Sequence, residues 1–515
     1  MVTGPIEVLV TANVAYPRLE SLFLTARSDI RMGFRLFDPT TRLLSKAGLA
    51  VGAVWADLIV DTLNRGVAVD LTLSDFDPVM ANDMHVQAWH FVARYLALNE
   101  LTRPGAARMS VRAMLHPAQG GIVPRLTFAY RTRTALADAI ARLNDSDNPA
   151  RALRFAPGLR DLVRLDGKTV VKRRFALPRL KPVTLHHKLA VFDGQTTYIG
   201  GLDLNNRRYD DNDHDRPAQN TWHDIQIVLT DPDIARDATA FLATMGAVIS
   251  GKRPPAPRVP GFIITQSRRR RFPVFHLSPK PLVSGLRDSH IDLIGKSRQL
   301  IYLESQYFRD RHIASVLAKA GRRHPGLTLL VLLPAAPEEA AFDDDPGLDA
   351  RFGEHLQARA IAQVHQAFKD RFLVVSPVQP RRPRADDDKS QRATLGAAPI
   401  VYVHAKVSMF DDDAAIIGSA NLNGRSLSWD SEAGVVLRGR GQMAGLRDAV
   451  FRHWLTDAAG AAFYDPATAF AAWRALAFDN LGRPPEQRQG FIVPYDLRPA
   501  ARQGQPLPGA PEDMV

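Results

Sequence analysis

The pattern of apolar and polar positions predicts an α/β chain whose second half repeats the first. Apolar runs of strand length alternate with stretches of helical periodicity, and both halves end in a helix that contains the string Arg-Asp-Ala. The matching segments are 31–37 with 299–308, 67–73 with 327–333, and 233–250 with 442–455. We expect each half to run strand, helix, strand, helix, strand, turn, strand, helix, which is an α/β lobe repeated once.

Proline-rich stretches set the expected boundaries between these lobes. We predict an N-terminal lobe over residues 1–250, a linker over 251–280, a C-terminal lobe over 281–480 and an extended Pro-rich tail over 481–515. The matched strands at 67 and 327 are 260 positions apart, whereas the histidine motifs at 186 and 404, described next, are 218 apart. The first lobe therefore carries roughly 40 additional residues by this subtraction, and we place the insertion at about 103–181.

Each half carries one copy of a short polar motif. His186-His187-Lys188 is followed by Asp193, and His404-Ala405-Lys406 is followed at the same distance by Asp411. Each copy then reaches a turn of small residues that ends in an acid or amide, GGLD at 200–203 and GSAN at 418–421. Two copies with matching turns indicate two half-sites that face each other across one active site.

The residue types of this motif suit a phosphodiester displacement. In H-x-K the two side chains emerge on one face of a strand, so the lysine ammonium can hold a phosphate oxygen beside the imidazole. One histidine can attack phosphorus while the other donates a proton to the leaving oxygen and then activates water or an alcohol. The lysines supply the positive charge that the transition state needs, so we expect no catalytic metal and no cofactor. We expect Asp224 to orient His186 and Glu432 to orient His404.

Composition narrows the class of protein. Of the 515 residues, 45% are hydrophobic, which allows a large core, and cysteine is absent, which excludes disulfides and thiolate chemistry. The first 20 residues lack a secretory pattern, and we expect no membrane span, so a cytoplasmic or peripheral membrane location is expected, with export by another route left open. A net charge of +12 favours a polyanionic partner such as a membrane surface, nucleic acid or a phosphorylated substrate.

The motifs and their flanks resemble the phospholipase D superfamily, in which each half carries H-x-K-x4-D-x6-G-[SG]-x-[ND]. The flanks at 208–210 (RYD), 222–224 (WHD) and 301–308 (IYLESQYF) resemble those of the plant, fungal and animal-type phospholipases D, and the likeness covers roughly 20–480. Ser305 replaces an asparagine of that pattern. The resemblance implies two pseudo-symmetric α/β lobes, each a mixed β-sheet flanked by helices, with one active site at their interface.

The resemblance also implies roles for individual residues. His186 is expected to be the nucleophile and His404 the acid and base, although the sequence does not break the symmetry between them. The catalytic set is His186, Lys188, Asp193, His404, Lys406 and Asp411, with the two aspartates more structural than chemical. The supporting set is Asp203, Asp224, Gln306, Ser419, Asn421 and Glu432.

The expected activity is hydrolysis of the distal phosphodiester of glycerophospholipids to phosphatidic acid and a free head-group alcohol, with transfer to alcohols as a side reaction. The alternatives are a cardiolipin synthase-like phosphatidyltransferase, a phosphodiesterase or nuclease of the same superfamily, and a catalytically idle lipid-binding protein. We expect the partner to be a phospholipid bilayer surface rather than nucleic acid, and the chain to be a monomer. Calcium or phosphoinositide dependence is not expected, because the catalytic lobe starts near the first residue. Head-group preference stays open.

Several conspicuous residues have plain structural interpretations. We expect His187 and His223 to pack or hydrogen-bond near the site rather than to catalyse. His214 lies in an acidic loop at 209–216 (YDDNDHDR), which we expect to be solvated or paired with arginines rather than to bind a metal. Trp222 and Trp429 are expected to pack beside the site.

Overall fold

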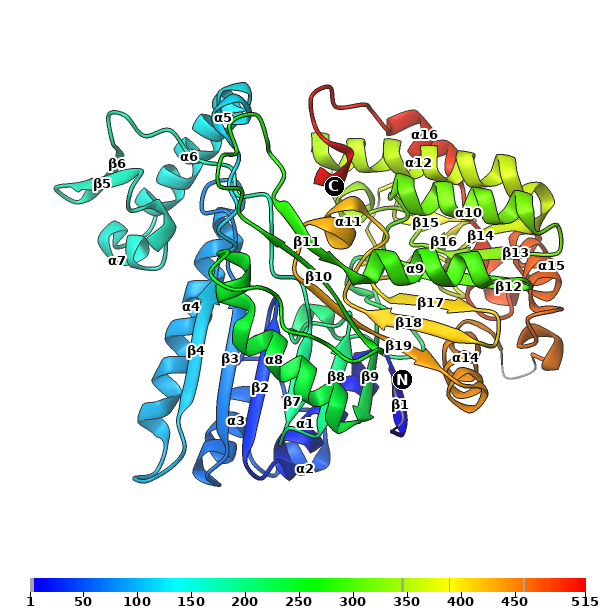
Figure 1. The fold of residues 1–515 in the computed structure, drawn as a ribbon, viewed down its shortest axis with the longest axis horizontal. Coiled ribbons are helices and arrows are strands. Elements are labelled where there is room, and N and C mark those ends of the chain that lie inside the picture. Colours follow the sequence, from blue (N-terminus) through cyan, green and yellow to red (C-terminus); the bar gives the residue numbers. More distant parts are fainter. Residues whose placement is uncertain (1–3, 344–346, 389, 457–458) are drawn as a thin grey trace.

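The protein folds into two α/β lobes that repeat one sheet topology. The structure is a computed structural model that describes residues 4–343, 347–388, 390–456 and 459–515. One large mixed sheet lies in each half of the chain, and helices cover the sheets (Figure 1). This confirms the expected fold class.

The first sheet has an antiparallel half and a half made of three parallel strands. Its order is β1 (Ile6–Val10), β9 (Ile225–Thr230), β8 (Thr196–Gly200), β7 (Leu189–Phe192), β2 (Asp29–Phe34), β3 (Ala68–Ser74) and β4 (Met109–Met114). Strands β2, β3 and β4 are parallel to one another, and the remaining pairs are antiparallel. The helices of this lobe are α1 (Ala12–Thr25), α2 (Lys46–Leu49), α3 (Trp55–Asn64), α4 (Asn82–Leu98) and α8 (Pro232–Ile249).

The second sheet has the same inner order. It runs β11 (Lys280–Ser284), β10 (Phe262–Arg268), β19 (Glu432–Arg438), β18 (Ala414–Gly418), β17 (Lys406–Phe410), β12 (Leu300–Ser305), β13 (Thr328–Leu332), β14 (Phe372–Pro377) and β20 (Ile492–Pro494). Strands β12, β13 and β14 are parallel. Its helices are α9 (Gly285–Lys296), α10 (Arg311–Arg323), α11 (Glu338–Phe342), α12 (Leu348–Phe368), α13 (Gly424–Ser428), α14 (Arg440–Trp454), α15 (Ala469–Gly482) and α16 (Leu497–Gln503), and a small hairpin joins β15 (Thr394–Leu395) to β16 (Ala398–Pro399).

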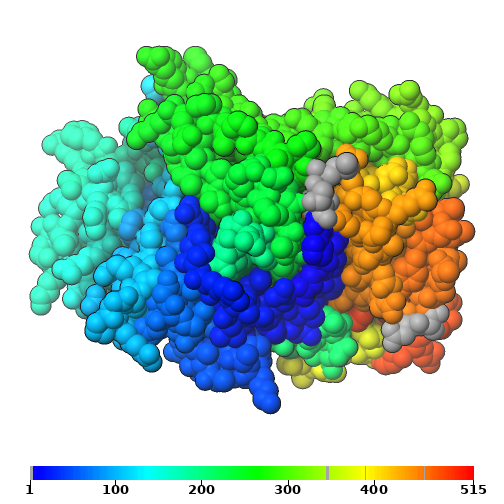
Figure 2. Space-filling model, turned by 60° about the horizontal axis from the view of Figure 1, so that its bottom comes forward, coloured from blue at the N-terminus to red at the C-terminus, as the bar shows by residue number. Residues whose placement is uncertain are grey.

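The apolar pattern of the sequence follows from the helices on both faces of the sheets. Strands β12, β13, β17 and β18 are buried or nearly so along their whole lengths, as expected for strands with both faces covered. One hydrophobic core contains side chains of both lobes, for example Ile227 and Val403, together with α8 and α14. Each lobe also has a further core, where its outer helices pack on its sheet. Because the lobes share a core, they form one continuous body in the space-filling view (Figure 2).

Two segments expected from the sequence, the linker and the tail, are assigned wrongly. The predicted linker contains β10, which pairs with β19 and begins the second lobe just as β1 pairs with β9 in the first. The predicted tail contains β20, which pairs with β14, and α16, which packs on α12. Polar and Pro-rich flanking composition concealed these elements. β20 is an edge strand, where proline and charge are tolerated, whereas β10 lies between β11 and β19.

The insertion begins later than expected. β4 pairs with β3 in the sheet and corresponds to β14 of the second lobe, so the additional chain starts after Met114. It contains α5 (Ile122–Thr127), α6 (Ala129–Asn144), α7 (Pro149–Arg154) and the hairpin of β5 (Val163–Asp166) and β6 (Thr169–Lys172), with a small core of its own. In Figure 1 this subdomain projects from one end of the first lobe. Among the described residues, no helix is both long and apolar enough to cross a membrane.

Candidate active site

The two motif histidines meet at the interface between the lobes. The ring centroids of His186 and His404 are 6.5 Å apart, which lets both imidazoles contact one phosphate group. Each histidine lies just before the strand of its motif, β7 or β17, and their side chains are 14% and 9% exposed. The two copies of the motif therefore form a single site.

Backbone hydrogen bonds across the interface hold this arrangement. The His186 amide donates to the Ser431 carbonyl over 2.9 Å, and the His404 amide donates to the His223 carbonyl over 2.7 Å. Isolated parallel bridges at the same places join Leu185 to Ser431 and His223 to Val403. Ser431 and His223 each precede an acidic residue, so each motif histidine is placed beside the acid of the opposite lobe.

The acidic partners of the histidines are thus exchanged between the lobes. His186 Nδ1 lies 3.0 Å from Glu432 Oε1, and His404 Nδ1 lies 2.6 Å from Asp224 Oδ2. The predicted pairing of each histidine with the acid downstream of its own motif is therefore wrong. A carboxylate at Nδ1 fixes the tautomer and leaves Nε2 as the reactive nitrogen of each ring.

Burial shifts the pKa values of these groups in opposite directions. It raises the pKa of Asp224 and of Glu432 to about 7. Burial, together with the nearby lysine ammonium groups, lowers the pKa of both His186 and His404 well below the ordinary value. Both shifts favour the neutral forms of the acid and of the imidazole, as burial does for ionisable groups in general.

The motif lysines lie beside the histidines. Lys188 Nζ donates to the His186 carbonyl over 2.7 Å and lies 3.5 Å from Asp203 Oδ2, while Lys406 Nζ lies 3.0 Å from His404 Nδ1. Burial lowers the pKa of Lys406 to about 7. A phosphate anion in the site would favour the charged form of this lysine and would gain its attraction in return.

The turn residues support the acids and the rim of the site. Ser419 Oγ donates to the Glu432 carboxylate, whereas Gly201, at the same place in the first turn, packs against Asp224 so closely that a Cβ would lie 2.2 Å from a carboxylate oxygen. Asn421 Nδ2 donates to Gln306 Oε1 over 3.1 Å. The two half-sites are therefore built differently around a longer and a shorter acid.

The motif aspartates lie at the other ends of their strands. Asp193 accepts hydrogen bonds from the backbone of residues 27–29, and Asp411 accepts from the backbone of residues 298–300. Both take a left-handed backbone conformation, with φ of 53° and 50°, which places the carboxylate over the start of the neighbouring strand. The prediction that Asp193 and Asp411 belong to the catalytic set is therefore wrong, because both lie away from the histidines. Asp193 connects β7 to β2, and Asp411 connects β17 to β12.

Replacing Asp193 with asparagine is expected to lower stability while turnover stays within about threefold of the parent. An amide nitrogen would face backbone donors, and losing such charge-assisted bonds costs about 1–3 kcal/mol. Burial raises the pKa of Asp193, but the hydrogen bonds from Ser28, Arg27 and Asp29 outweigh it and lower the pKa below the ordinary value. This stabilisation is therefore present above about pH 3.9, the unfolded value, and is lost as pH falls through the lower folded value. Thermal melts should show the gap between parent and variant closing in acid; a large loss of turnover at full stability would contradict the structural role.

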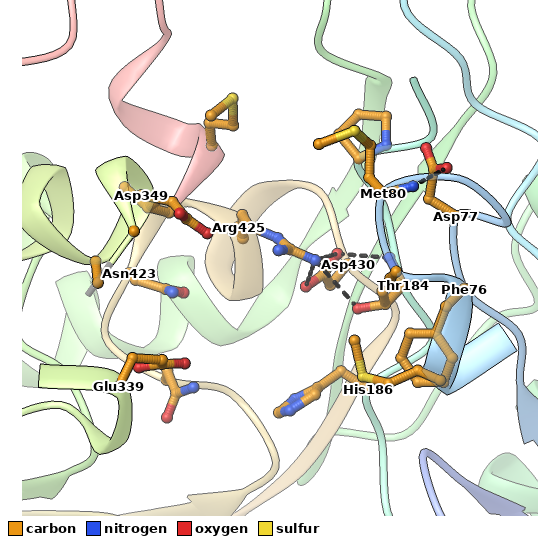
Figure 3. Close-up of a pocket in the computed structure, with 18 of the residues that line it drawn as sticks. Phe76, Asp77, Met80, Thr184, His186, Glu339, Asp349, Asn423, Arg425 and Asp430 are labelled. Atoms are coloured by element: carbon orange, nitrogen blue, oxygen red, sulfur yellow. Dashed lines mark hydrogen bonds and ion pairs between the residues drawn. The ribbon is translucent and has the colours of Figure 1, made fainter. Parts of the chain in front are cut away.

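A cavity of 560 Å³ opens over the histidines, and its walls differ in character. The wall formed by the first lobe and its insertion carries apolar side chains, Phe76, Met80, Met84, Phe128, Leu180 and Pro182, among polar and charged ones. The wall formed by the second lobe is acidic, with Glu338, Glu339, Asp343 and Asp349. Figure 3 shows Phe76 and Met80 on one side, Glu339 and Asp349 on the other, and His186 between Glu339 and Phe76.

Arginines also line the cavity, at Arg35, Arg208, Arg309 and Arg425. Sequence reasoning singled out none of these as site residues, nor the acidic wall. Two of these arginines could have been identified as site residues from the sequence. Arg35 lies at the end of a predicted strand, and Arg208 lies in the RYD flank. The Glu338-Glu339 pair carries no such signal, because α11 joins the site only through the packing of the second lobe.

The remaining sequence candidates fall in two groups. Trp222 stacks beside His404, with ring centroids 4.7 Å apart, and Arg208 lies over its face at 3.5 Å, while Trp429 is buried nearby. His187 is buried against Phe241, as expected of a packing residue. The acidic loop at 209–216 differs from the expectation: its histidine and first aspartate are fully buried rather than solvated.

Several known proteins are similar to this chain. Residues 290–454 match the family described as "Cardiolipin synthase, PLD-like domain". Phospholipase D zeta 1 of Arabidopsis thaliana is 29% identical over 174 residues, which are 30% of this chain and 16% of that protein. Phospholipase D1 of Schizosaccharomyces pombe is 24% identical over 347 residues, 49% of this chain and 25% of that protein. These matches therefore span a quarter or less of the relatives' own length.

The fold also has a solved counterpart. The crystal structure of phosphatidylserine synthase from Haemophilus influenzae Rd KW20 superposes with a TM-score of 0.50 at 12% identity, over 86% of this chain and 84% of that one. The two-lobed architecture is therefore shared, at a sequence distance where only the fold can be compared.

Proposed function

We propose that this chain, which belongs to the phospholipase D superfamily, hydrolyses the distal phosphodiester bond of glycerophospholipids at a membrane surface. The observation that carries the proposal is the pair of histidines across one cavity, each oriented by the buried acid of the opposite lobe. The products would be phosphatidic acid and the free head-group alcohol. The curated relatives named phospholipase D support this choice among the activities of the superfamily.

We propose one reaction for this pair of histidines, with His186 as the nucleophile. His186 Nε2 attacks phosphorus, and the bond between phosphorus and the head-group oxygen breaks as His404 delivers its proton to that oxygen. Glu432 accepts the hydrogen bond from His186 Nδ1 and balances the positive charge of the substituted ring. His404, now neutral, takes a proton from water, and the resulting hydroxide displaces His186 from phosphorus. A primary alcohol in place of water would give the transfer product.

The two cavity walls suit the two ends of such a lipid. The apolar side chains of the first-lobe wall can cover the glycerol and first acyl carbons, and the acidic wall can face a cationic head group such as ethanolamine or choline. Glu338 is paired with Arg207 and Arg208, whereas Glu339 is exposed at the cavity wall. Glu339 is therefore the carboxylate that we assign to the head-group ammonium.

Replacing Glu339 with glutamine is expected to lower kcat/KM on phosphatidylethanolamine about three- to tenfold, because a partly exposed ion pair contributes about 1 kcal/mol. Hydrolysis of phosphatidylglycerol, which has no cationic group, should change less than twofold. Glu100→Gln, at an exposed position outside the cavity, is the matched control. An equal loss of kcat/KM on both lipids would contradict the assignment of Glu339 to head-group binding.

The experiment that tests the function is a panel of phospholipid vesicles assayed for phosphatidic acid, with and without ethanol. Phosphatidic acid in water and phosphatidylethanol with ethanol are expected. Release of neither product from any glycerophospholipid would overturn the proposal.

Phosphatidyl transfer between lipids is the second candidate, because the matched family is described by a cardiolipin synthase. The acceptor would then be the hydroxyl of a second lipid instead of water. Incubation with phosphatidylglycerol alone separates the two activities, since cardiolipin and glycerol would form in place of phosphatidic acid.

A further inference from the structure

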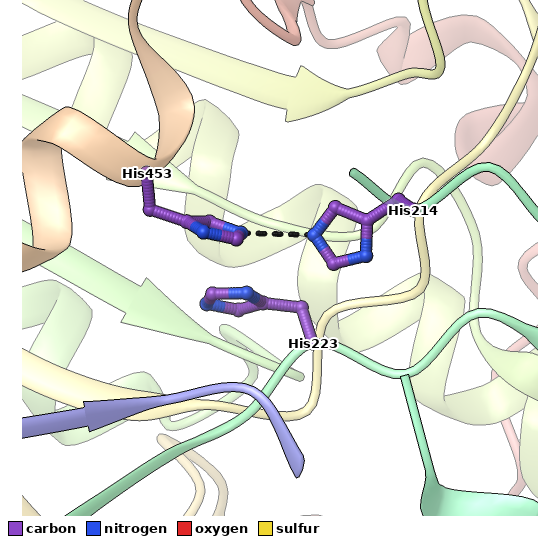
Figure 4. A group of neighbouring side chains, drawn as sticks. All are labelled: His214, His223 and His453. Atoms are coloured by element: carbon purple, nitrogen blue, oxygen red, sulfur yellow. Dashed lines mark hydrogen bonds between the residues drawn. The ribbon is translucent and has the colours of Figure 1, made fainter. Parts of the chain in front are cut away.

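Three histidines outside the catalytic site converge at the interface between the lobes. His214 and His223 come from the first lobe and His453 comes from α14 of the second (Figure 4). One ligand nitrogen from each lies within 4.8 Å of those of the other two, and His214 Nε2 is 2.9 Å from His453 Nε2. His214 and His223 are fully buried, and His453 is partly exposed.

Buried acids orient two of these rings from behind. His214 Nδ1 lies 2.7 Å from Asp210 Oδ2, and His223 Nε2 lies 2.7 Å from Glu304 Oε1. Asp210 also accepts from the Trp222 amide, so its position is fixed independently of the histidine. A carboxylate on the far nitrogen is the usual second contact of a metal-bound histidine, because it sets the tautomer and strengthens the donor.

The backbone is shaped to present the first of these histidines. His214 has a φ of 51°, a left-handed conformation that is costly for a residue with a Cβ. The carboxylate of Asp210 and the ring of Trp454, which stacks on His214 with centroids 5.9 Å apart, hold it there. A solvated loop, as the sequence predicted, would not need a histidine in this backbone conformation.

A pair of neutral imidazoles explains only part of the cluster. One ring can donate to the other between His214 and His453, which satisfies both Nε2 atoms. His223 Nδ1 is then left buried with no hydrogen-bond partner among the described residues. An unpaired buried nitrogen costs free energy, and the His223 ring lies beside the other two rings (Figure 4), with a nitrogen within 4.8 Å of one from each.

We propose that His214, His223 and His453 bind a divalent transition-metal ion of the zinc class that fastens the two lobes together. Neutral imidazole nitrogens suit this class of ion. In a tetrahedral site, metal–nitrogen bonds of about 2.0–2.1 Å separate the donors by about 3.3 Å. The 2.9 Å pair is already close to that separation, and a turn of the partly exposed His453 ring brings its lone pair onto the ion. Water completes the fourth position from the exposed side.

The ion would support the catalytic site without joining its chemistry. His223 is hydrogen-bonded through its backbone to Tyr402 and His404, and it precedes Asp224. Fixing His223 to α14 would hold the strand that carries the acid in register with the second motif. The histidine displacement in the proposed function needs no metal, so the two proposals fail separately.

The test is metal binding by the purified full chain. Stripped protein is titrated with Zn²⁺ and with Co²⁺, and we expect one equivalent of each, a tetrahedral Co²⁺ visible spectrum from nitrogen ligands, and a rise in Tm of several degrees. His453→Gln, at the partly exposed position where folding is least at risk, should weaken binding at least about tenfold. His312→Gln, on the exposed surface of α10, should bind as the parent does, and His290→Gln controls for loss of a buried imidazole elsewhere.

Each outcome decides the proposal. Binding by the parent and by His312→Gln but not by His453→Gln supports it. No saturable binding by the parent, or equal binding by His453→Gln, overturns it and leaves a hydrogen-bonded histidine cluster. Lipid hydrolysis is measured in parallel on stripped and loaded protein, so that failure of the proposed function would show as inactivity of both.

Discussion

Alanine in place of His186 or of His404 should each lower phospholipid hydrolysis by about 10³-fold or more, because each imidazole performs a step that no neighbouring group can replace. The two rings lie 6.5 Å apart by centroid and line the same cavity, so in the proposed reaction both steps occur on one phosphorus. The double variant should be about as inactive as either single variant, since residues that act as a unit are not additive. Initial rates on phosphatidylcholine vesicles measure the effect, with the exposed His312→Ala as control.

The same variants distinguish the roles of the two histidines. With a substrate whose leaving group needs no protonation, His404→Ala should accumulate a phosphorylated His186 that water removes slowly, and His186→Ala should form no covalent species. Acid-labile label on the protein, located by peptide mapping, reports which ring is substituted. Label on His404 in the parent protein would reverse the assignment, and near-normal hydrolysis by either alanine variant would refute the two-histidine reaction.

Removing either orienting acid should have the second largest effect. Glu432→Gln and Asp224→Asn are each expected to lower kcat by about 10²- to 10⁴-fold, as when the acid behind a catalytic histidine becomes an amide. An amide can present NH₂ to Nδ1 and favour the wrong tautomer, and it cannot balance the charge on the ring. Because burial raises the pKa of both acids to about 7, the amide variants should also lose the pH dependence that these groups impose near neutrality.

The exchange of partners between the lobes makes this prediction specific. Nδ1–H resonances in NMR spectra should change for His186 in Glu432→Gln and for His404 in Asp224→Asn. A change at the histidine of the same lobe instead would contradict the crossed pairing. Asp193→Asn, which alters an acid of the motif far from the rings, should leave both resonances in place.

Local patterns carried much of this architecture. Apolar periodicity and the spacing of the two motifs were enough to predict a repeated α/β lobe. The periodicity of a strand or a helix can be recognised within a few consecutive residues. The chemistry of H-x-K was also local, since the histidine and lysine are two positions apart. These features required no knowledge of how the lobes face each other.

The sequence patterns did not identify three strands of the two large sheets. β10 and β20 lie in segments that composition marked as linker and tail, and β4 lies in the predicted insertion. β4 and β20 tolerate charge or proline because each is an edge strand with only one side paired, whereas β10 is flanked by polar, Pro-rich chain. Only their pairing with β19, β14 and β3 identifies them as parts of the sheets.

The sequence by itself determined that two half-sites with histidine and lysine exist and that an acid follows each of them. Tertiary structure alone decided which acid serves which histidine, because the backbone bonds from His186 to Ser431 and from His404 to His223 bring each motif against the opposite lobe. It also gathered His214, His223 and His453, which are up to 239 positions apart, into one buried cluster. Contacts between distant segments depend on how two packed surfaces meet, and no single stretch of residues encodes that meeting.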